Sequence, residues 1–209
     1  MLDKSSIAII GYSGHAYVVL ETAKLLGVEI IGYCEKSQVL KNPYDLKYLG
    51  FEGDKEFDWD VADKFVLAIG ENNQRTGIGK YIKSKSKHLV NIIHPNASMS
   101  YTVKVGWGNF IGTNVIINAL ADIGDYCILN TGSIIEHECK IADGVHIAPG
   151  AVLAGNVKIG QNTFIGANAV IKQGINIGKN VIIGAGSVVV RDIPDNQVWV
   201  GNPAKLLKR

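Results

Sequence analysis

The stretch Ile141–Gly160, IADGVHIAPGAVLAGNVKIG, decides the fold, because an aliphatic residue stands at every sixth position. These residues are Ile141, Ile147, Leu153 and Ile159. The same spacing holds at all 17 positions from Ile93 to Val189, each of which is aliphatic or methionine. A second series, four residues further along each hexad, is mostly small or β-branched. A hexapeptide repeat with two inward side chains predicts a parallel β-helix in which three hexads close one coil.

The first part of the chain has another pattern, in which short apolar runs alternate with helical spacing. Strands are predicted over Ile7–Ile10, Val28–Tyr33, Phe65–Ile69 and Leu89–Ile93, and helices over Tyr17–Leu26 and Glu71–Lys83. Gly77 and Gly79 weaken the second helix, and Glu35–Trp59 is less regular. Alternating strands and helices predict a small parallel sheet. We expect a Rossmann-like α/β domain over residues 1–92 and a β-helix domain with a C-terminal tail over 93–209.

Composition excludes several classes of protein. A net charge of +2 over 209 residues is too mild for nucleic-acid binding, and no basic stripe is present. The three cysteines form no CxxC, which argues against a disulfide framework or a metal site and favours a reducing compartment. No signal peptide and no run of ~20 apolar residues is found, so a cytoplasmic protein without a membrane span is expected.

The loop Gly11–Ala16, GYSGHA, joins a predicted strand to a predicted helix. Backbone N–H groups at a helix N-terminus favour an anion, and glycine allows a phosphate to approach closely. The spacing is GxxGH rather than GxGxxG, so a dinucleotide site is poorly supported. A tight turn without a ligand fits this loop equally well.

The densest ionisable cluster of the repeat lies within Asn130–Pro149. His137 and Glu138 are adjacent at a corner, and with three hexads per coil Ala119 and Gly155 lie beside His137. Histidine changes its charge near neutral pH, so it can take a proton from an attacking amine while a carboxylate orients its ring. From the residues alone, a solvated corner histidine is the simpler interpretation.

Other polar and sulfur-containing residues have simpler explanations. His88 and His94 flank the domain junction and fit surface or packing positions. Cys127 and Cys139 belong to the inward series and are predicted to fill the core. The basic tail 200–209 either is solvated or meets a phosphate.

Six segments carry a resemblance to a known family. They are GYSGHA, AIGENNQR (Ala68–Arg75), NIIHP (Asn91–Pro95), LNTGSIIEHE (Leu129–Glu138), AGNVKIG (Ala154–Gly160) and VGNPAK (Val200–Lys205). The chain thereby resembles the bacterial nucleotide-sugar N-acetyltransferases of the sialic-acid O-acetyltransferase-like hexapeptide group. Members of the bacillosamine-pathway type acetylate UDP-linked 4-amino-4,6-dideoxy sugars. The resemblance implies a left-handed β-helix, acetyl-CoA as co-substrate, and a homotrimer with active sites between subunits.

The resemblance also implies roles for individual residues. His137 would be the general base with Glu138 as its partner, and the Gly155 N–H would meet the thioester carbonyl. The residues assigned to acetyl-CoA are His146, Gly155, Ala167, Ala185 and Lys205. The residues assigned to the nucleotide sugar are Ser13, Gly14, His15, Glu35 and Asn118. Relatives often carry two acidic residues after the second strand, where this chain has Cys34 and Glu35, so UDP is only favoured over GDP.

The sequence is also compatible with other functions. The same group acetylates a sialic acid hydroxyl or the amine of a GDP-linked amino sugar. A non-catalytic scaffolding β-helix is the alternative from another class. A scaffold has no need of a His–Glu pair, which therefore favours an enzyme.

Overall fold

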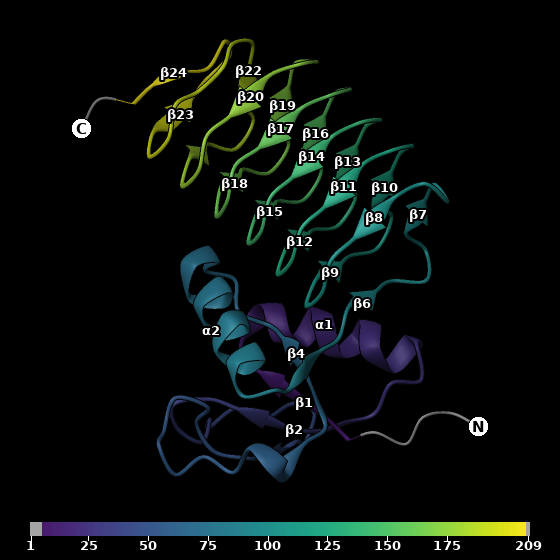
Figure 1. Ribbon diagram of the computed structural model, residues 1–209, viewed down its shortest axis with the longest axis vertical. Coiled ribbons are helices and arrows are strands. Elements are labelled where there is room, and N and C mark those ends of the chain that lie inside the picture. Colours follow the sequence, from purple (N-terminus) through teal and green to yellow (C-terminus); the bar gives the residue numbers. More distant parts are fainter. Residues whose placement is uncertain (1–5, 208–209) are drawn as a thin grey trace.

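The structure is a computed structural model that describes residues 6–207, and it consists of an α/β unit followed by a β-helix (Figure 1). The α/β unit lies against the first coils, and the later coils extend away from it. The chain passes from one unit to the other between β5 and β6, at residues 90 and 91.

The α/β unit contains a five-stranded parallel sheet with the order β3-β2-β1-β4-β5. Its strands are β1 Ile7–Ile10, β2 Ile30–Cys34, β3 Lys47–Tyr48, β4 Lys64–Leu67 and β5 His88–Leu89. Its helices are α1 Gly14–Leu25, α2 Asn72–Ser84 and the 3-10 turn η1 Trp59–Val61. Strand β3 lies in the stretch for which no strand was predicted, because two residues are too few to show a pattern.

Alternate residues of the central strands pack against the two helices on opposite faces of this sheet. Ile9 and Val66 share a buried cluster with residues of α1, whereas Ile10 and Phe65 share one with Ile82 of α2. A parallel sheet covered on both faces explains why its strands read as continuous apolar runs.

The predicted strand Leu89–Ile93 is wrong in one respect, because it forms two strands in different sheets. β5 pairs with β4, whereas β6 (Ile92–Ile93) pairs with β9 in the β-helix. Apolar residues continue through both strands, so the sequence pattern does not mark the point where the chain changes sheets.

The β-helix is a left-handed parallel coil with three sheets of very short strands. The docking sheet, which faces the α/β unit, contains β6, β9 (Phe110–Ile111), β12 (Ile128–Leu129), β15 (His146–Ile147), β18 (Phe164–Ile165), β21 (Ile182–Ile183), β23 (Val198–Val200) and β24 (Lys205–Leu206). Residues 18 apart pair with each other, as Ile128 does with His146.

Two further sheets complete the prism. The apolar sheet contains β7 (Ser98–Met99), β10 (Ile116–Ile117), β13 (Ile134–Ile135), β16 (Val152–Leu153), β19 (Val170–Ile171) and β22 (Val188–Val189). The charged sheet contains β8 (Lys104–Val105), β11 (Asp122–Ile123), β14 (Lys140–Ile141), β17 (Lys158–Ile159) and β20 (Asn176–Ile177). The second residue of most strands lies in the buried core, and the first residue faces outward.

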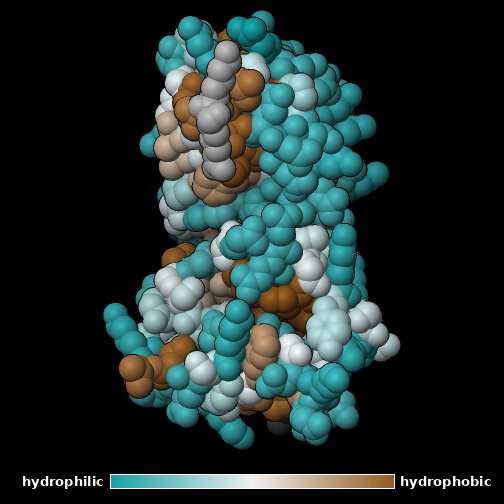
Figure 2. Space-filling model, turned by 90° about the vertical axis from the view of Figure 1, so that its left-hand side faces the viewer, coloured by the Kyte–Doolittle hydropathy of each residue, from teal (hydrophilic) through white to brown (hydrophobic). Residues whose placement is uncertain are grey.

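The last coil ends in a short antiparallel pair formed by β23 and β24. Trp199 and Ala204 are buried here and close the core. Apolar side chains nevertheless gather on the outside of this end, in the upper part of Figure 2. They include Val200, Leu206 and Leu207, which stay exposed.

Helix α2 holds the two units together by lying along one corner of the β-helix. The corner residues Tyr126, Gly144 and Asn162 follow one another at the 18-residue spacing, and each contacts α2. Arg75, which is 1% exposed, donates to the carbonyl oxygens of Tyr126 (2.7 Å) and Gly144 (2.8 Å). The Lys83 ammonium lies 2.7 Å from the Asp125 carboxylate at the other end of α2.

Gly79 of α2 is a point of close approach between the two units. A Cβ atom at this position would lie 2.6 Å from the Tyr126 ring. A Cβ atom at Gly77 would meet nothing within 4 Å. The two glycines that weaken the sequence prediction of this helix therefore have different surroundings.

We predict opposite effects for the same substitution at these two glycines. Gly77→Ala should raise the free energy of unfolding by up to ~1 kcal/mol, because alanine favours a helix more than glycine does. Gly79→Ala should lower it by ~1–3 kcal/mol, because the methyl group overpacks against Tyr126. Urea denaturation of both variants checks this pair, and equal effects would contradict the close packing of α2.

Candidate active site

The first candidate group, called here the His137 corner, comprises Asn118, His137, Glu138 and Gly155 at the turns between the apolar and charged sheets. The ring Nδ1 of His137 lies 3.1 Å from Glu138 Oε2. In the tautomer that donates this bond, Nε2 keeps its lone pair and can accept a proton. The His137 side chain is 50% exposed, so a substrate can reach it.

Gly155 lies one coil further on, next to the edge of the His137 ring. A Cβ atom at position 155 would lie 2.5 Å from His137 Cε1 and Nε2, so only glycine leaves room for this ring position. Within residues 6–207 the Gly155 N–H donates to no other group, whereas the neighbouring Asn156 N–H bonds the His137 carbonyl at 2.8 Å. A basic nitrogen and an unpaired backbone donor are thus adjacent.

Backbone pairing also brings Asn118 into this corner. The Asn118 N–H donates to Ile135 O at 2.9 Å, and the Glu138 N–H donates to Ala119 O at 2.9 Å. Asn118 therefore lies one coil before the His137–Glu138 pair. All four residues of the corner come together in a single chain.

The second candidate group lies between the α/β unit and the docking sheet, where His15 and His146 are both mostly buried. His146 Nε2 is 3.4 Å from Asn130 Nδ2, and the His146 ring meets Phe164 edge-to-face. His15 Nε2 and His146 Nδ1 have no hydrogen-bond partner among the described residues. Both nitrogens are buried where the two units meet.

Burial and the nearby Arg75 cation keep both imidazoles neutral. Burial and, to a smaller extent, the Arg75 charge lower the pKa of His146 to about 3 and that of His15 to about 4. For His146, the nearby His15 ring also disfavours protonation. His146 therefore acts at neutral pH as an uncharged donor or acceptor rather than as a cation.

Three residues assigned to the nucleotide sugar lie at the carboxyl ends of the strands of the α/β sheet. Ser13 and Gly14 are exposed and precede or begin α1, directly after β1. Glu35 follows β2, and its Oε2 atom accepts from the Tyr12 N–H at 3.4 Å. Strand order changes direction at β1, between β2 and β4, which is where ligands bind in open parallel sheets.

The remaining predicted residues lie on other edges of the β-helix. Ala167 and Ala185 stack one coil apart at the corner between the docking and apolar sheets, since the Gly186 N–H bonds Ala167 O at 2.8 Å. Lys205 is on β24 at the C-terminal end. The apolar sheet separates the two alanines from His137, and His146 faces outward from the docking sheet. Within one chain these residues and His137 are therefore not brought together.

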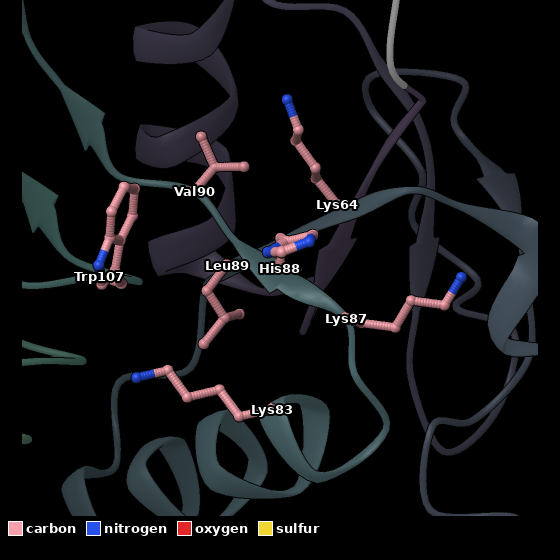
Figure 3. Close-up of a pocket in the computed structure, with 7 residues that line it drawn as sticks. All are labelled: Lys64, Lys83, Lys87, His88, Leu89, Val90 and Trp107. Carbon is pink, nitrogen blue, oxygen red and sulfur yellow. The ribbon is translucent and has the colours of Figure 1, made fainter.

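A hollow of about 560 Å³ lies elsewhere, and none of the predicted site residues lines it (Figure 3). Its lining comprises Lys64, Lys83, Lys87, His88, Leu89, Val90 and Trp107. Figure 3 shows the lysine ammonium groups pointing in different directions. Lys83 pairs with Asp125 and Lys87 with Asp60, so this basic hollow does not converge on an anion.

The cysteines are unsuited to nucleophilic catalysis. Cys34, Cys127 and Cys139 are all buried free thiols. Burial raises the pKa of Cys127 to about 12, so its reactive thiolate form is disfavoured. In the described part of the chain, no group of three or more His, Cys, Asp or Glu side chains is placed to hold a metal ion.

Comparison with known proteins gives matches along most of the chain. The family model for the PglD N-terminal domain matches residues 6–82, and two hexapeptide-repeat transferase models match residues 121–155 and 156–191. PerB from Caulobacter crescentus, solved in complex with CoA and GDP-perosamine, is 34% identical with a TM-score of 0.88, and each chain is covered completely. The chain belongs to the hexapeptide-repeat nucleotide-sugar N-acetyltransferase family.

Other structures place this acyltransferase in the same family. The acetyltransferase domain of PglB from Neisseria gonorrhoeae, solved with acetyl coenzyme A, is 32% identical with a TM-score of 0.91 over 98% of this chain and 100% of that one. WeeI from Acinetobacter baumannii is 24% identical with a TM-score of 0.86 over 97% of this chain and 99% of that one, which supports the fold. No helix within residues 6–207 of this acyltransferase is long and apolar enough to cross a membrane.

Arg75 is the residue that sequence analysis missed at this site. It appears there only as the last letter of AIGENNQR, on a weakly predicted helix. Its guanidinium also donates to the carbonyls of Ile69 and Gly70 at 3.0 Å, which fixes the loop beside His15 and His146. A charged residue on an otherwise polar helix gives no sequence signal for burial.

We predict that His146 makes the acyltransferase acid-sensitive. Its folded pKa of about 3 lies below the unfolded value of 6.5, so the unfolded chain binds the extra proton and stability falls as pH drops through this window. From pH 6.5 to pH 5 the loss is ~2 kcal/mol.

The variant His146→Gln removes this titration. Urea unfolding should show a smaller loss of free energy between pH 7 and pH 5 in the variant than in the unmodified protein, whatever their stability at pH 7. The same loss in both proteins would show that the ring is not held neutral.

Proposed function

We propose that this protein transfers the acetyl group of acetyl-CoA to the 4-amino group of a nucleotide-linked 4-amino-4,6-dideoxy sugar. The observation that carries the proposal is the His137 corner, in which a carboxylate-paired imidazole lies beside an unpaired backbone N–H. Membership of the family, and the CoA ligands named for PerB and the PglB domain, support the donor.

The proposed reaction is a direct transfer. The amine nitrogen attacks the thioester carbonyl carbon, and His137 Nε2 takes the proton that the amine loses. Glu138 stabilises the resulting imidazolium, and the Gly155 N–H donates to the oxyanion. The C–S bond then breaks, and the CoA thiolate leaves as the amide forms. One such donor typically contributes ~2.7–4 kcal/mol to the stability of the transition state.

A complete site requires a neighbouring copy of the chain. Ala167, Ala185 and His146 lie across the apolar sheet from His137, so a ligand that contacts both edges must bridge two chains. The outward residues of the apolar sheet support this arrangement: after Ser98 they are Ile116, Ile134, Val152, Val170 and Val188. We therefore propose a homotrimer in which one subunit supplies His137 and the next supplies the nucleotide-binding loop with Ser13, Gly14 and His15.

The nucleotide is proposed to be UDP, with GDP as the second candidate. The resemblance to the bacillosamine-pathway type supports UDP, and the GDP-perosamine ligand of PerB supports GDP as the alternative. Glu35 would act at the nucleoside, but an ionised carboxylate accepts hydrogen bonds from either base or from ribose. Acetylation rates with UDP-linked and GDP-linked amino sugars decide between the two nucleotides. Free sialic acid as a third acceptor tests the O-acetylation alternative. A cytoplasmic location fits the three free thiols.

Replacement of the base tests the reaction. His137→Ala should lower kcat by ~10²–10⁴-fold, because general base catalysis contributes this much. The melting temperature should hardly change, because the side chain is half exposed. The matched control is His88→Ala, another exposed histidine, which should keep full activity. Turnover by His137→Ala at the unmodified rate would refute the role of this ring.

Replacement of an outward residue of the apolar sheet tests the trimer. Val170→Glu should dissociate it and abolish transfer, because a carboxylate would be buried between copies. Lys158→Glu, on the charged sheet, should leave both the mass and the rate unchanged. Light scattering at micromolar concentration measures the mass. An active monomer would contradict a site shared between chains.

A further inference from the structure

One corner position of the β-helix recurs every six residues with a positive φ. It occurs at 14 positions from Gly108 to Gly186, and eleven of them are glycine or asparagine. These eleven are Gly108, Asn114, Gly132, Gly144, Gly150, Asn156, Asn162, Asn168, Gly174, Asn180 and Gly186. Glycine and asparagine adopt left-handed backbone with the least strain, so this is the composition that the corner itself selects.

Three residues break this rule, and two of them have visible reasons. Tyr126 is buried against Gly79 of α2 and Gly108. Glu138 holds the ring of His137. The third is Leu120, which has a φ of +64° and is 61% exposed. Neither packing nor the backbone of a single chain accounts for an aliphatic residue there.

Leu120 lies next to the His137 corner. It is one coil before Glu138 and directly follows Ala119, whose carbonyl accepts from the Glu138 N–H. On its other side, the Leu120 N–H donates to Thr102 Oγ1 at 3.0 Å. Neighbouring coils are ~4.8 Å apart, so Leu120 is within one side-chain length of the reacting centre.

Other exposed apolar residues extend this surface. Tyr101, which is 99% exposed, belongs to the same corner series as Ala119 and His137, two coils before the histidine. Ile116, an outward residue of the apolar sheet, borders this surface on the adjoining strand. An apolar surface thus leads up to the imidazole from the side of Asn118.

We infer that Leu120 and Tyr101 form an apolar subsite that receives the deoxy methyl group of the acceptor sugar. This inference rests on the proposed function. In a 4-amino-4,6-dideoxy sugar the methyl group is attached to the ring carbon next to the one that bears the amine. When the amine meets His137, the methyl group is therefore held about one coil away, where Leu120 lies. A sugar that carries a hydroxyl group on the methyl carbon would bring a polar group against an apolar surface.

The variant Leu120→Asn tests this subsite without straining the corner, because asparagine is a residue that the matching corners use. The readout is kcat/KM with two nucleotide-linked acceptors, the 4-amino-4,6-dideoxy sugar and its 6-hydroxy counterpart. The unmodified protein should prefer the deoxy sugar by about tenfold or more, and Leu120→Asn should remove about tenfold of this preference. The KM for acetyl-CoA should stay the same.

The matched control is Leu25→Asn, at the end of α1, where the leucine is 64% exposed. It should keep the unmodified preference. An unchanged preference in Leu120→Asn overturns the inference. The inference is also overturned if Leu120→Asn loses kcat/KM equally on both acceptors and the oligomer dissociates or the melting temperature falls markedly. Leu120 would then be needed for assembly or folding. If the unmodified protein acetylates neither acceptor, the proposed function is itself wrong and the subsite falls with it.

Discussion

Pairing between residues 18 apart is the constraint on which this structure depends. Each strand of the β-helix has only two residues, and nearly all pairs follow the same register, as in Ile117 with Ile135 and Ile135 with Leu153. A slip by one residue would turn the inward aliphatic series outward, so burial of the core fixes the register. The same register places His137 between Ala119 and Gly155 and aligns the three corners that α2 contacts.

A buried guanidinium joins this coil to the α/β unit. Arg75 has no carboxylate partner within hydrogen-bond distance among the described residues, and it is satisfied mainly by backbone carbonyls from both units. An arginine with five donors in a planar arrangement can serve several fixed acceptors at once. Burial, with a smaller contribution from this charge, keeps His15 and His146 neutral. The residue that joins the two units therefore also affects the protonation of two imidazoles beside it.

The corner positions show how structural and functional demands can be separated. Eleven of fourteen corners carry the residue types that left-handed backbone favours, so the exceptions need a reason outside the backbone. Tyr126 packs at the junction between the units, and Glu138 pairs with the His137 imidazole. Local rules are expected to break at functional sites, where another interaction outweighs the strain. Leu120 follows the same logic on the acceptor side of the site.

The sequence by itself determined the β-helix, its coil length and the His137 corner, because a hexad repeat fixes which residues stack on which. It also located the α/β unit and most of its strands. Tertiary structure alone decided that Leu89–Ile93 divides between two sheets, that Arg75 is buried, and that His146 faces the α/β unit. These outcomes depend on how two units pack together. Such packing depends on contacts distant in sequence, which leave no periodic signal in the chain.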